Sequence, residues 1–485
     1  MEVIFDYSVS GKSGYRLPQD PFPNMSFPEL EAAGILRKEL PRLPEVSEMD
    51  VVRHYTHLST LNYGVDTGYY PLGSCTMKYN PKINEDVAAM PGFSGIHPLH
   101  VQEDSQGILS VLYELEKRLC QIFGFAAFTL QPAAGAQGEY TGLLIMKAYH
   151  RDQGNLHKDI ILVPDSSHGT NPASVTCVGW QTVTVKSNAQ GTVDLEDLRS
   201  KLSDRVAGIM LTNPNTLGVF ETDILEIARL VHEIDGLVYW DGANGNAVMG
   251  YMKPAEYGFD ICHLNLHKTF STPHGGGGPG AGPVGVIEKL IPYLPAPRVV
   301  FNEGVFSLDQ AYPLSVGRLH SFFGNVGILV RAYVYICTLG AEGLKEASEN
   351  AVLLANYMKL RLSEHFDIAT QGLCKHEFVI SLKREKKEHG IKAIDVAKRL
   401  MDFGFHPPTI YFPLNIPEAL MIETPETETL ETIESFIEAL IAIKTECIEH
   451  PEILHEAPHH KIIGRLDEVK AAKEPCLRYV LTPFL

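Results

Sequence analysis

The sequence predicts an α/β protein whose large domain is built on a mostly parallel sheet, and three observations lead to that prediction. Short apolar runs alternate with stretches in which apolar residues recur every three or four positions, the spacing of an amphipathic helix. Polar or glycine-rich segments follow several of these runs. The chain has 485 residues, of which 45% are hydrophobic, and is long enough for two or three domains with large cores.

The expected elements follow one another in a regular order. From Gln106 to Ile122 the apolar residues have helical spacing, which marks the start of the α/β domain. Strands are then expected at 159–163, 208–212, 237–241 and 284–287, and helices at 135–149, 193–203 and 223–234. Later in the chain the pattern predicts a strand at 377–382 and helices at 330–362, 391–402 and 427–444.

These elements divide the chain into three parts. Residues 1–100 are rich in proline, glycine and tyrosine and have helical spacing only near 28–40 and 47–60, so we expect an arm that packs on another surface rather than a disordered leader. Residues 101–330 are expected to form the large α/β domain. Residues 331–485 are expected to form a smaller α+β domain that ends in an irregular tail.

Composition and charge argue against several classes of protein. The chain has 41 Lys and Arg against 59 Asp and Glu, a net charge of -18 with no basic run, so we expect no nucleic-acid partner. The first residues do not resemble a signal peptide and no run of about 18 apolar residues appears, so we expect a soluble cytoplasmic protein without a membrane partner. The eight cysteines form no CxxC pair or Cys/His cluster, so no metal site is expected.

One lysine, Lys268, lies between the end of an apolar run and a glycine-rich loop. The segment reads His263-Leu-Asn-Leu-His-Lys-Thr-Phe-Ser-Thr-Pro-His-Gly-Gly-Gly-Gly-Pro-Gly280. Glycines let the backbone approach a bulky ligand closely. An amine forms an imine with an aldehyde only when it is deprotonated, and desolvation favours the neutral amine. Polar neighbours such as His267 argue against a plain surface lysine.

A second apolar run ends in an acid. In Val238-Tyr-Trp-Asp-Gly-Ala-Asn-Gly245, Asp241 stands at the strand end and the small Ala243 follows two residues later. A carboxylate beside a pyridine nitrogen keeps that nitrogen protonated, which makes the ring an electron sink, and Ala243 would lie flat beneath the ring. A strand-end Asp can also serve only as a helix cap.

A stretch of small residues, Gln131-Pro-Ala-Ala-Gly-Ala-Gln-Gly-Glu139, precedes the helix expected from residue 135. Backbone N–H groups are free at a helix N-terminus, where they stabilise a phosphate. The segment lacks the GK[ST] ending of a P-loop, and a turn without a ligand is the alternative. The phosphate-binding candidates are Ala134, Gly135, Ala136 and Gln137.

Two further polar loops follow expected strands. The loop from Pro164 to Ser174 contains His168, whose flat ring could stack on a pyridine. The loop that starts with Thr212 and Asn213 belongs to the same sheet edge and could reach a ring hydroxyl. Ligands of α/β sheets bind at the carboxyl ends of the strands, which favours a function for both loops.

The order of these features along the chain is that of a fold-type I pyridoxal 5'-phosphate enzyme, the aspartate aminotransferase-like class. A phosphate loop comes first, then a stacking histidine, a strand-end acid and a loop lysine. The sequence therefore predicts that Lys268 holds pyridoxal 5'-phosphate as a Schiff base, that His168 and Asp241 are the other catalytic residues, and that His267 contacts the cofactor.

Five longer strings carry a resemblance to a known family. They are Gly73-Ser-Cys-Thr-Met-Lys-Tyr-Asn-Pro81, Ser166-Ser-His-Gly-Thr-Asn-Pro-Ala173, Leu211-Thr-Asn-Pro-Asn-Thr-Leu-Gly218, Leu264-Asn-Leu-His-Lys-Thr-Phe270 and Ser321-Phe-Phe-Gly-Asn325. In these strings the chain resembles the glycine decarboxylase P-protein of the glycine cleavage system, in the form that is split over two chains. Undivided members have a lysine-free half before a lysine-bearing half, so the resemblance implies subunit 2.

The resemblance also implies a reaction and its partners. Glycine would displace Lys268 from the cofactor, lose its carboxylate as CO2 and leave a carbanion delocalised into a ring that Asp241 keeps protonated. The aminomethyl group would then pass to the lipoyl arm of H-protein, the activity named glycine dehydrogenase (aminomethyl-transferring). The implied partners are glycine, subunit 1 and lipoylated H-protein, and the resemblance implies heterodimers with subunit 1 that assemble into a heterotetramer with two copies of each chain.

Some assignments stay open. The candidates for binding the glycine carboxylate are Ser74, Thr76, Lys78 and Arg318. Cys75 is either a regulatory thiol or a packed, inert cysteine. The rim of a channel for the lipoyl arm is expected in the glycine-rich loop and in the tail around His459, His460 and Arg465.

Two other functions are compatible with parts of the sequence. One is another fold-type I enzyme that acts on a small amino acid, such as a hydroxymethyltransferase, an aminotransferase or an amino-acid decarboxylase. The strings at 73–81 and 166–173 argue against it. The other is a non-catalytic scaffold that pairs with an active partner, in which Lys268 would carry no cofactor.

Overall fold

The structure, a computed structural model, describes residues 2–14, 27–39, 41–275 and 280–477. The chain forms two compact units: Met1–Gly64 with His460–Leu485, and Val65–His459. The boundaries that the sequence analysis places after residues 100 and 330 differ from this division, and the three-part arrangement stays a prediction. The whole candidate site lies in the second unit.

The first unit contains short helices. The longest is α2 (Glu48–Thr60), where Ser47 and Asp50 form a capping box, so the helix expected at 47–60 is confirmed. The helix expected at 28–40 extends only over Pro28–Ala32 (α1) and is followed by Gly34 at φ +68°, a conformation that ends helices. The other helices of this unit are η1 (Ile4–Tyr7) and α16 (Glu468–Lys473).

The large sheet of the second unit has seven strands in the order β1-β7-β6-β5-β4-β2-β3. β7 alone runs opposite to the other six strands, so the predicted mostly parallel sheet is confirmed. The strands are β1 (Ala127–Thr129), β2 (Ile160–Pro164), β3 (Gln181–Val185), β4 (Val206–Thr212), β5 (Leu237–Gly242), β6 (Ile261–Leu264) and β7 (Val284–Val286).

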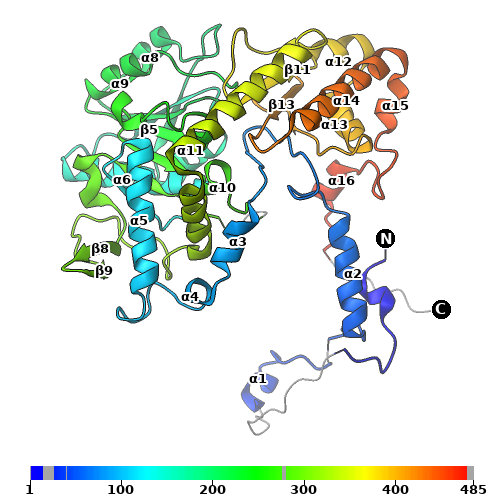
Figure 1. Cartoon of the computed structure of the whole chain (residues 1–485), viewed down its shortest axis with the longest axis horizontal. Coiled ribbons are helices and arrows are strands. Elements are labelled where there is room, and N and C mark those ends of the chain that lie inside the picture. Colours follow the sequence, from blue (N-terminus) through cyan, green and yellow to red (C-terminus); the bar gives the residue numbers. More distant parts are fainter. Residues whose placement is uncertain (1, 15–26, 40, 276–279, 478–485) are drawn as a thin grey trace. The chain divides into compact units, whose positions relative to one another are not determined.

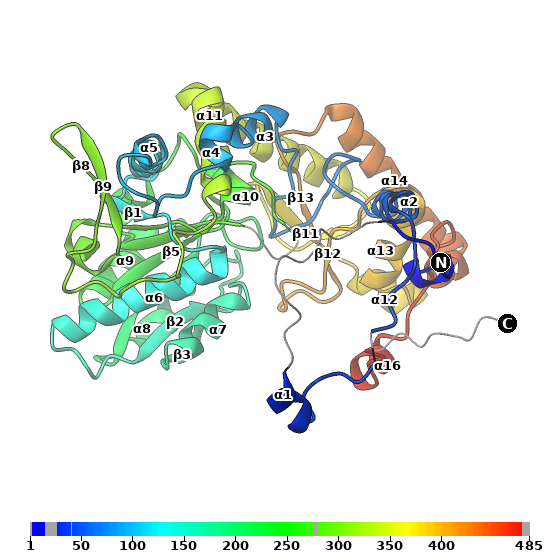
Figure 2. The same cartoon turned by 90° about the horizontal axis from the view of Figure 1, so that it is seen from below.

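Helices cover both faces of this sheet because its strands are apolar on both sides. In β5, Val238 and Trp240 face one core, and Leu237 and Tyr239 face the other. The first core includes α5 (Gln106–Phe123) and the second includes α6 (Gly135–Asp152), so these helices lie on opposite faces (Figure 2). Further helices are α7 (Thr170–Cys177), α8 (Leu195–Lys201), α9 (Ile224–His232) and α10 (Leu266–Thr269).

A second sheet of four antiparallel strands has the order β10-β11-β13-β12. Its strands are β10 (Asp367–Ile368), β11 (Glu377–Ser381), β12 (Thr409–Ile410) and β13 (Ala419–Glu423). It packs with α12 (Lys383–His389), α13 (Ala393–Asp402), α14 (Leu430–Glu449) and α15 (Pro451–Glu456), and has its own hydrophobic core. The α+β arrangement expected in this part of the chain is confirmed.

One long helix, α11 (Val326–Leu362), connects the two sheets (Figure 1). It is kinked at Gly340, whose backbone is not helical. Leu329 and Tyr335 belong to the core of the large sheet, whereas Met358 and Leu362 belong to the core of the second sheet. Among the described residues, α11 is the one helix long and apolar enough to span a membrane, and it contributes residues to both cores.

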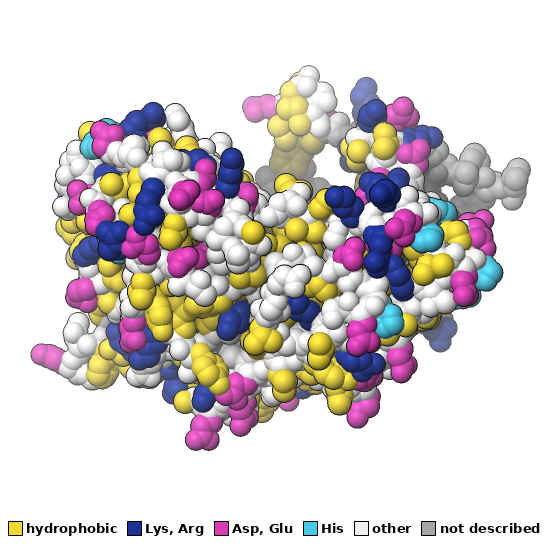
Figure 3. Space-filling view, turned by 90° about the horizontal axis from the view of Figure 1, so that it is seen from above, with side chains coloured by type: hydrophobic (Ala, Val, Ile, Leu, Met, Phe, Trp, Pro, Cys, Tyr) yellow, Lys and Arg dark blue, Asp and Glu magenta, His cyan; other side chains and the backbone are white. Residues whose placement is uncertain are grey.

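Short elements complete the second unit. A hairpin of β8 (Arg298–Asn302) and β9 (Val305–Asp309) contacts α5. The remaining helices are α3 (Lys82–Ala88), α4 (Pro91–Ser94), η2 (Gly245–Ala247), η3 (Pro254–Tyr257) and η4 (Glu288–Tyr293). Acidic and basic side chains are interspersed on the face shown in Figure 3.

Candidate active site

A cavity of about 270 Å³ lies at the carboxyl edge of the large sheet. Side chains that follow four parallel strands line it: His168 after β2, Thr212 at the end of β4, Asp241 in β5 and Lys268 after β6. Parallel strands bring their carboxyl ends to one edge, which is why residues far apart in sequence meet here. The cavity is closed on another side by Ser74 and its neighbours.

Lys268 reaches into this cavity from α10. Its side chain is buried, with 6% of the residue exposed, and Nζ donates a hydrogen bond to the backbone carbonyl of Ser74 over 2.6 Å. The amine therefore has a neutral oxygen as its hydrogen-bond acceptor.

The N-terminus of α6 forms a second wall of the cavity. Ala134 is extended, Gly135 begins the helix, and no side chain caps it, so the first backbone N–H groups are available to an anion. Ala134, Gly135 and Ala136 line the cavity as predicted for a phosphate site. Gln137 is not among the lining residues, because its Oε1 accepts a hydrogen bond from the N–H of Ala133 over 2.7 Å. Gln137 thus shapes the loop that leads into the helix.

Asp241 is almost fully buried beside His263. Its Oδ1 accepts a hydrogen bond from the N–H of Ala243 over 3.0 Å and lies 3.4 Å from Nε2 of His263. The Thr212 hydroxyl donates to Oδ2 over 3.4 Å, and the Tyr239 hydroxyl contacts Nδ1 of His263 over 2.7 Å. The predicted strand-end acid therefore faces the cavity with a neighbouring imidazole instead of capping a helix of its own.

Asn213, which the sequence analysis grouped with Thr212, does not line the cavity. Its Oδ1 accepts a hydrogen bond from the N–H of Glu221 over 3.0 Å, and its carbonyl accepts one from the indole of Trp240 over 2.7 Å. Asn213 is fully buried and fixes the loop after β4. Its prediction as a cofactor contact remains a prediction.

His168 stands at the mouth of the cavity and is connected to a buried acid. Nδ1 of His168 lies 2.9 Å from the Thr170 hydroxyl, which donates to Oε1 of Glu139 over 2.7 Å. The Ser174 hydroxyl donates to Oε2 of the same carboxyl group over 3.2 Å. Burial, and then the charge of Asp241, raises the pKa of Glu139 to about 8. These surroundings favour the protonated form of Glu139.

His267, Cys75 and His274 meet beside Lys268. The thiol of Cys75 lies 3.9 Å from Nε2 of His267, and the rings of His267 and His274 are 4.5 Å apart. Burial, and then the charge of Lys268, holds the pKa of His267 well below its usual value, so its ring is neutral. Burial also raises the pKa of the Cys75 thiol, although the charge of Lys268 opposes that shift. This environment disfavours a reactive thiolate.

The candidates for the glycine carboxylate are separated by the structure. Ser74 lines the cavity. Thr76 is buried behind it, with its hydroxyl bonded to Glu423, and Lys78 is buried in an ion pair of 2.7 Å with Glu426. Arg318 is exposed and does not line the cavity.

The rim predicted for the lipoyl channel is only partly described. Residues 276–279 of the glycine-rich loop lie outside the described residues. Nε2 of His459 contacts the carbonyl of Ile453 over 2.8 Å within the second unit, whereas His460 and Arg465 belong to the first unit. The rim therefore stays a prediction.

Several lining residues were missed by the sequence analysis. Glu139 follows Gly135 by four positions, the helical spacing that puts both on one face, and this spacing was an available signal. His263 pairs with Asp241 across neighbouring strands, which only the strand register reveals. The other missed residues are Thr170, Thr216, Asn244, Asn265 and His274.

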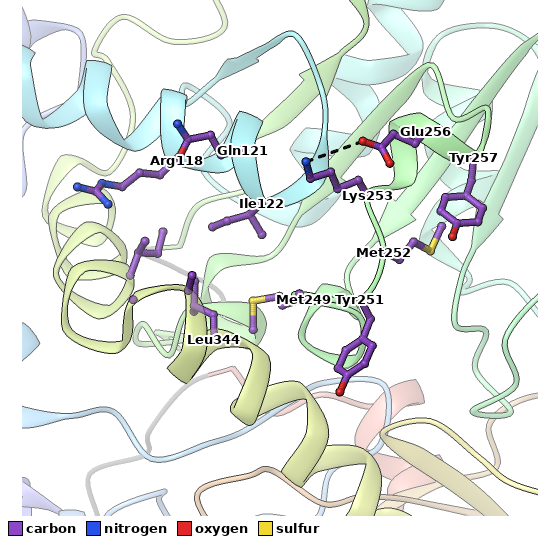
Figure 4. Close-up of a pocket in the computed structure, with 14 residues that line it drawn as sticks. Arg118, Gln121, Ile122, Met249, Tyr251, Met252, Lys253, Glu256, Tyr257 and Leu344 are labelled. Atoms are coloured by element: carbon purple, nitrogen blue, oxygen red, sulfur yellow. Dashed lines mark ion pairs between the residues drawn. The ribbon is translucent and has the colours of Figure 1, made fainter.

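A different cavity of about 450 Å³ lies between α5, residues 249–257 and α11 (Figure 4). Its lining is mainly apolar, with Ile122, Met249 and Leu344, and Lys253 forms an ion pair of 3.8 Å with Glu256 at its edge. It shares no residue with the cavity around Lys268. This cavity has a larger volume than the one around Lys268 but contains none of the predicted catalytic residues, so volume alone does not identify the reactive site.

The residues around Lys268 fit pyridoxal phosphate. The uncapped N-terminus of α6 suits the phosphate, the carboxylate of Asp241 suits the ring nitrogen, and the amine of Lys268 suits the aldehyde. Oδ1 of Asn244, a buried oxygen in the lining, has no hydrogen-bond partner among the described residues and is available to a bound donor.

Two family descriptions match parts of the chain. Residues 347–459 match the C-terminal domain of glycine dehydrogenase, and residues 143–277 match aminotransferase class V. A probable glycine dehydrogenase (decarboxylating) subunit 2 from Caldanaerobacter subterraneus is 56% identical over 477 residues, 98% of each chain. A protein of the same description from Halalkalibacterium halodurans is 55% identical over 477 residues, again 98% of each chain.

Solved structures have the same fold. A glycine decarboxylase (P-protein) of the glycine cleavage system in inhibitor-bound form has a TM-score of 0.71 at 20% identity, and the match covers 88% of this chain and all of that one. A glutamate decarboxylase from Lactobacillus brevis has a TM-score of 0.65 at 13% identity, over 85% of this chain and 95% of its own. These neighbours confirm the predicted fold-type I class.

Proposed function

The chain belongs to the family of the glycine dehydrogenase (decarboxylating) subunit 2 proteins, which depend on pyridoxal phosphate, and from that premise we propose that Lys268 is the lysine that carries the cofactor. The protein takes part in the decarboxylation of glycine. The observation that carries our proposal is the position of Lys268, a buried amine between the α6 N-terminus, Asp241 and the Ser74 carbonyl.

Several of the residues that line the cavity then have a defined task. Bound pyridoxal phosphate supplies an electron sink for the negative charge that forms when glycine loses its carboxylate. The N–H groups at Gly135 and Ala136 would hold the phosphate, and the buried carboxylate of Asp241 would keep a proton on the ring nitrogen. His168 would stack on the ring, and the small side chain of Ala243 would leave room for it.

Other residues support the binding of the cofactor and of glycine. Thr212 and His267 line the cavity and are proposed to contact the ring hydroxyl and the phosphate. Gln137 and Asn213 act through the loops that they hold. Ser74 is the proposed contact for the glycine carboxylate, because it is the one substrate candidate that lines the cavity.

The proposed partners follow from the family. The name subunit 2 implies a second subunit, and we propose a complex with two copies of each chain. Lipoylated H-protein is proposed to accept the aminomethyl group, which is supported by the fold likeness to a P-protein of the glycine cleavage system. We place this complex in the cytoplasm.

Exchange of labelled bicarbonate into the carboxyl group of glycine tests the function. The exchange should require this chain, subunit 1 and lipoylated H-protein together, and no exchange in the complete mixture would refute the proposal. The alternative fold-type I enzymes would act on their own amino acids without H-protein.

A lysine variant tests the role of Lys268 separately. Lys268→Ala should abolish the visible absorbance band of lysine-bound cofactor and the exchange activity. Lys253→Ala, which removes a half-exposed lysine at the edge of the other cavity, is the matched control and should keep both. A band that persists in Lys268→Ala would show that another group carries the cofactor. Absence of the band from the unaltered complex would favour the non-catalytic scaffold.

A further inference from the structure

Two glutamates face each other in the second sheet, outside the cavity. Glu377 of β11 pairs with Glu423 of β13, and antiparallel partners point their side chains to the same face. The residues are 0% and 1% exposed, and neither lines the cavity around Lys268. One carboxyl oxygen of Glu377 lies within 4.8 Å of one of Glu423. Two full negative charges this close and this deeply buried would repel each other strongly.

No lysine or arginine among the described residues forms an ion pair with either carboxyl group. The nearest basic group is His376, whose Nε2 lies 3.6 Å from Oε1 of Glu377. Burial, and then the charge of Lys268, lowers the pKa of His376 to about 3, so this ring is neutral. Burial raises the pKa of Glu423 to about 7 and raises that of Glu377 well above its usual value, each against the opposing charge of Lys268. One retained proton removes the repulsion.

Both carboxyl groups hold the same loop, residues 72–76. Oε2 of Glu377 accepts a hydrogen bond from the N–H of Ser74 over 2.6 Å, and Oε1 of Glu423 accepts one from the Thr76 hydroxyl. Leu72 forms an isolated antiparallel bridge with Ile422 at the same strand end. The second sheet therefore anchors this loop through the two acids.

The loop has an unusual backbone where it meets Lys268. Ser74 has φ +63°, in the left-handed region that side chains other than glycine rarely adopt. Its N–H donates to Glu377, while its carbonyl accepts from Nζ of Lys268. The peptide unit before Ser74 therefore contacts Glu377, and the peptide unit after Ser74 contacts Lys268.

We infer that Glu377 and Glu423 share one proton and are positioning residues for Lys268. Together they keep the Ser74 loop in a conformation in which the Ser74 carbonyl accepts a hydrogen bond from the Lys268 amine. This hydrogen bond forms whenever the amine is not bound to cofactor. This inference rests on the proposed role of Lys268.

The charge balance around the pair supports this arrangement. With one proton, the pair carries one negative charge, and the nearby charge of Lys268 acts against a further rise in the pKa of either acid. The other charged groups near the pair are Lys78 and Glu426, which neutralise each other in their own ion pair. Loss of the shared proton would add an uncompensated charge to a fully buried site.

Variants of Glu377 in the purified complex with subunit 1 test the positioning role. Glu377→Ala removes the acceptor for Ser74, so the affinity for pyridoxal phosphate should fall about tenfold or more, the effect of losing a hydrogen bond to a buried charged group. The visible band of lysine-bound cofactor should also return more slowly after glycine is removed. Glu377→Gln keeps an acceptor oxygen and should recover most of both properties.

Glu116→Ala is the matched control. Glu116 is also a buried acid that accepts a backbone N–H, from Phe128 over 3.4 Å, and burial raises its pKa. It contacts neither the Ser74 loop nor the cavity, so cofactor affinity and the return of the band should be unchanged. An equal loss in Glu377→Ala and Glu116→Ala would mean a general structural effect and would overturn the inference.

Infrared spectroscopy tests the shared proton without relying on a variant that folds poorly. The unaltered complex should show the carbonyl stretch of a protonated, buried carboxyl group at neutral pH, and Glu423→Gln should remove the contribution of this pair. Bound metal that disappears in Glu423→Gln would instead mean that a cation, not a proton, joins the two acids.

The outcomes separate this inference from the role of Lys268. If Lys268→Ala keeps the visible band, the lysine assignment fails. If Lys268→Ala loses the band while Glu377→Ala binds cofactor like the unaltered protein, the lysine assignment stands and the positioning role fails.

Discussion

Nζ of Lys268 donates a hydrogen bond to the carbonyl oxygen of Ser74 over 2.6 Å, although 194 positions separate the two residues in the chain. Both residues line the same cavity, and the contact gives the amine a fixed place beside the N-terminus of α6. Four predictions examine how the groups around this contact work.

Adding one methyl group at the start of α6 should weaken cofactor binding. A Cβ on Gly135 would lie 2.0 Å from Oδ1 of Asn265, so either the side chain or the helix terminus must shift. We expect Gly135→Ala to cost about 1 to 3 kcal/mol in the binding of pyridoxal phosphate. Spectroscopic titration measures the affinity. Gly107→Ala, in α5 where a Cβ meets nothing within 4 Å, should leave it unchanged, and equal affinities in both variants would contradict the prediction.

Removing the charge of Asp241 should slow the chemistry more than it weakens binding. Asp241→Asn keeps an oxygen for the N–H of Ala243 but no longer holds a proton on the ring nitrogen. The bicarbonate exchange rate should fall on the order of a hundredfold. Asp309→Asn is the control, since Asp309 also accepts a backbone N–H two residues on, from Ala311 over 2.9 Å. Full activity in Asp241→Asn would refute the assigned role.

The protonated carboxyl group of Glu139 should make the stability of the cofactor-free protein depend on pH. Its pKa is raised to about 8, so between the ordinary glutamate value and pH 8 the folded chain binds a proton that the unfolded chain lacks. The stabilisation is complete at low pH and falls by up to about 1.4 kcal/mol per pH unit as pH rises through this window.

Glu139→Gln should remove this dependence, because an amide does not ionise. The difference in melting temperature between the two proteins should change from pH 5 to 8 and then level off. A constant difference over that range would show that Glu139 is already ionised at the low end.

Breaking the buried ion pair between Lys78 and Glu426 should destabilise the second unit. Nζ of Lys78 also donates to the Thr269 carbonyl over 3.2 Å and to the Tyr335 hydroxyl over 3.3 Å. Lys78→Met leaves the Glu426 carboxylate without its cation and should cost about 3 kcal/mol. The double variant Lys78→Met, Glu426→Gln should recover much of that loss in urea unfolding. No recovery would indicate that packing of the lysine stem dominates.

The catalytic candidates were predictable because each follows an apolar run. Asp241 ends the strand expected at 237–241 and Lys268 follows an apolar run, and parallel strands bring such ends together. The antiparallel direction of β7 was not predictable, because a strand of three residues carries no directional pattern. β1 was not expected at all, because it also has only three residues.

The buried acids were not predictable from periodicity. Glu377 and Glu423 stand at the ends of apolar strands, where a charged residue normally marks the solvent. Their burial depends on the loop around Ser74, which is remote in sequence and packs on them only in the folded chain. The same applies to His263, whose place beside Asp241 follows from the register of β5 and β6.

The hydrogen bond between Thr76 and Glu423 joins residues 347 positions apart, and it has a consequence for synthesis in the cell. The ribosome makes the Ser74 loop early, yet its anchoring strand β13 is among the last strands to be translated. Contacts this distant in sequence form late in folding. A nascent chain that stalls before residue 423 therefore lacks the strand that anchors the Ser74 loop.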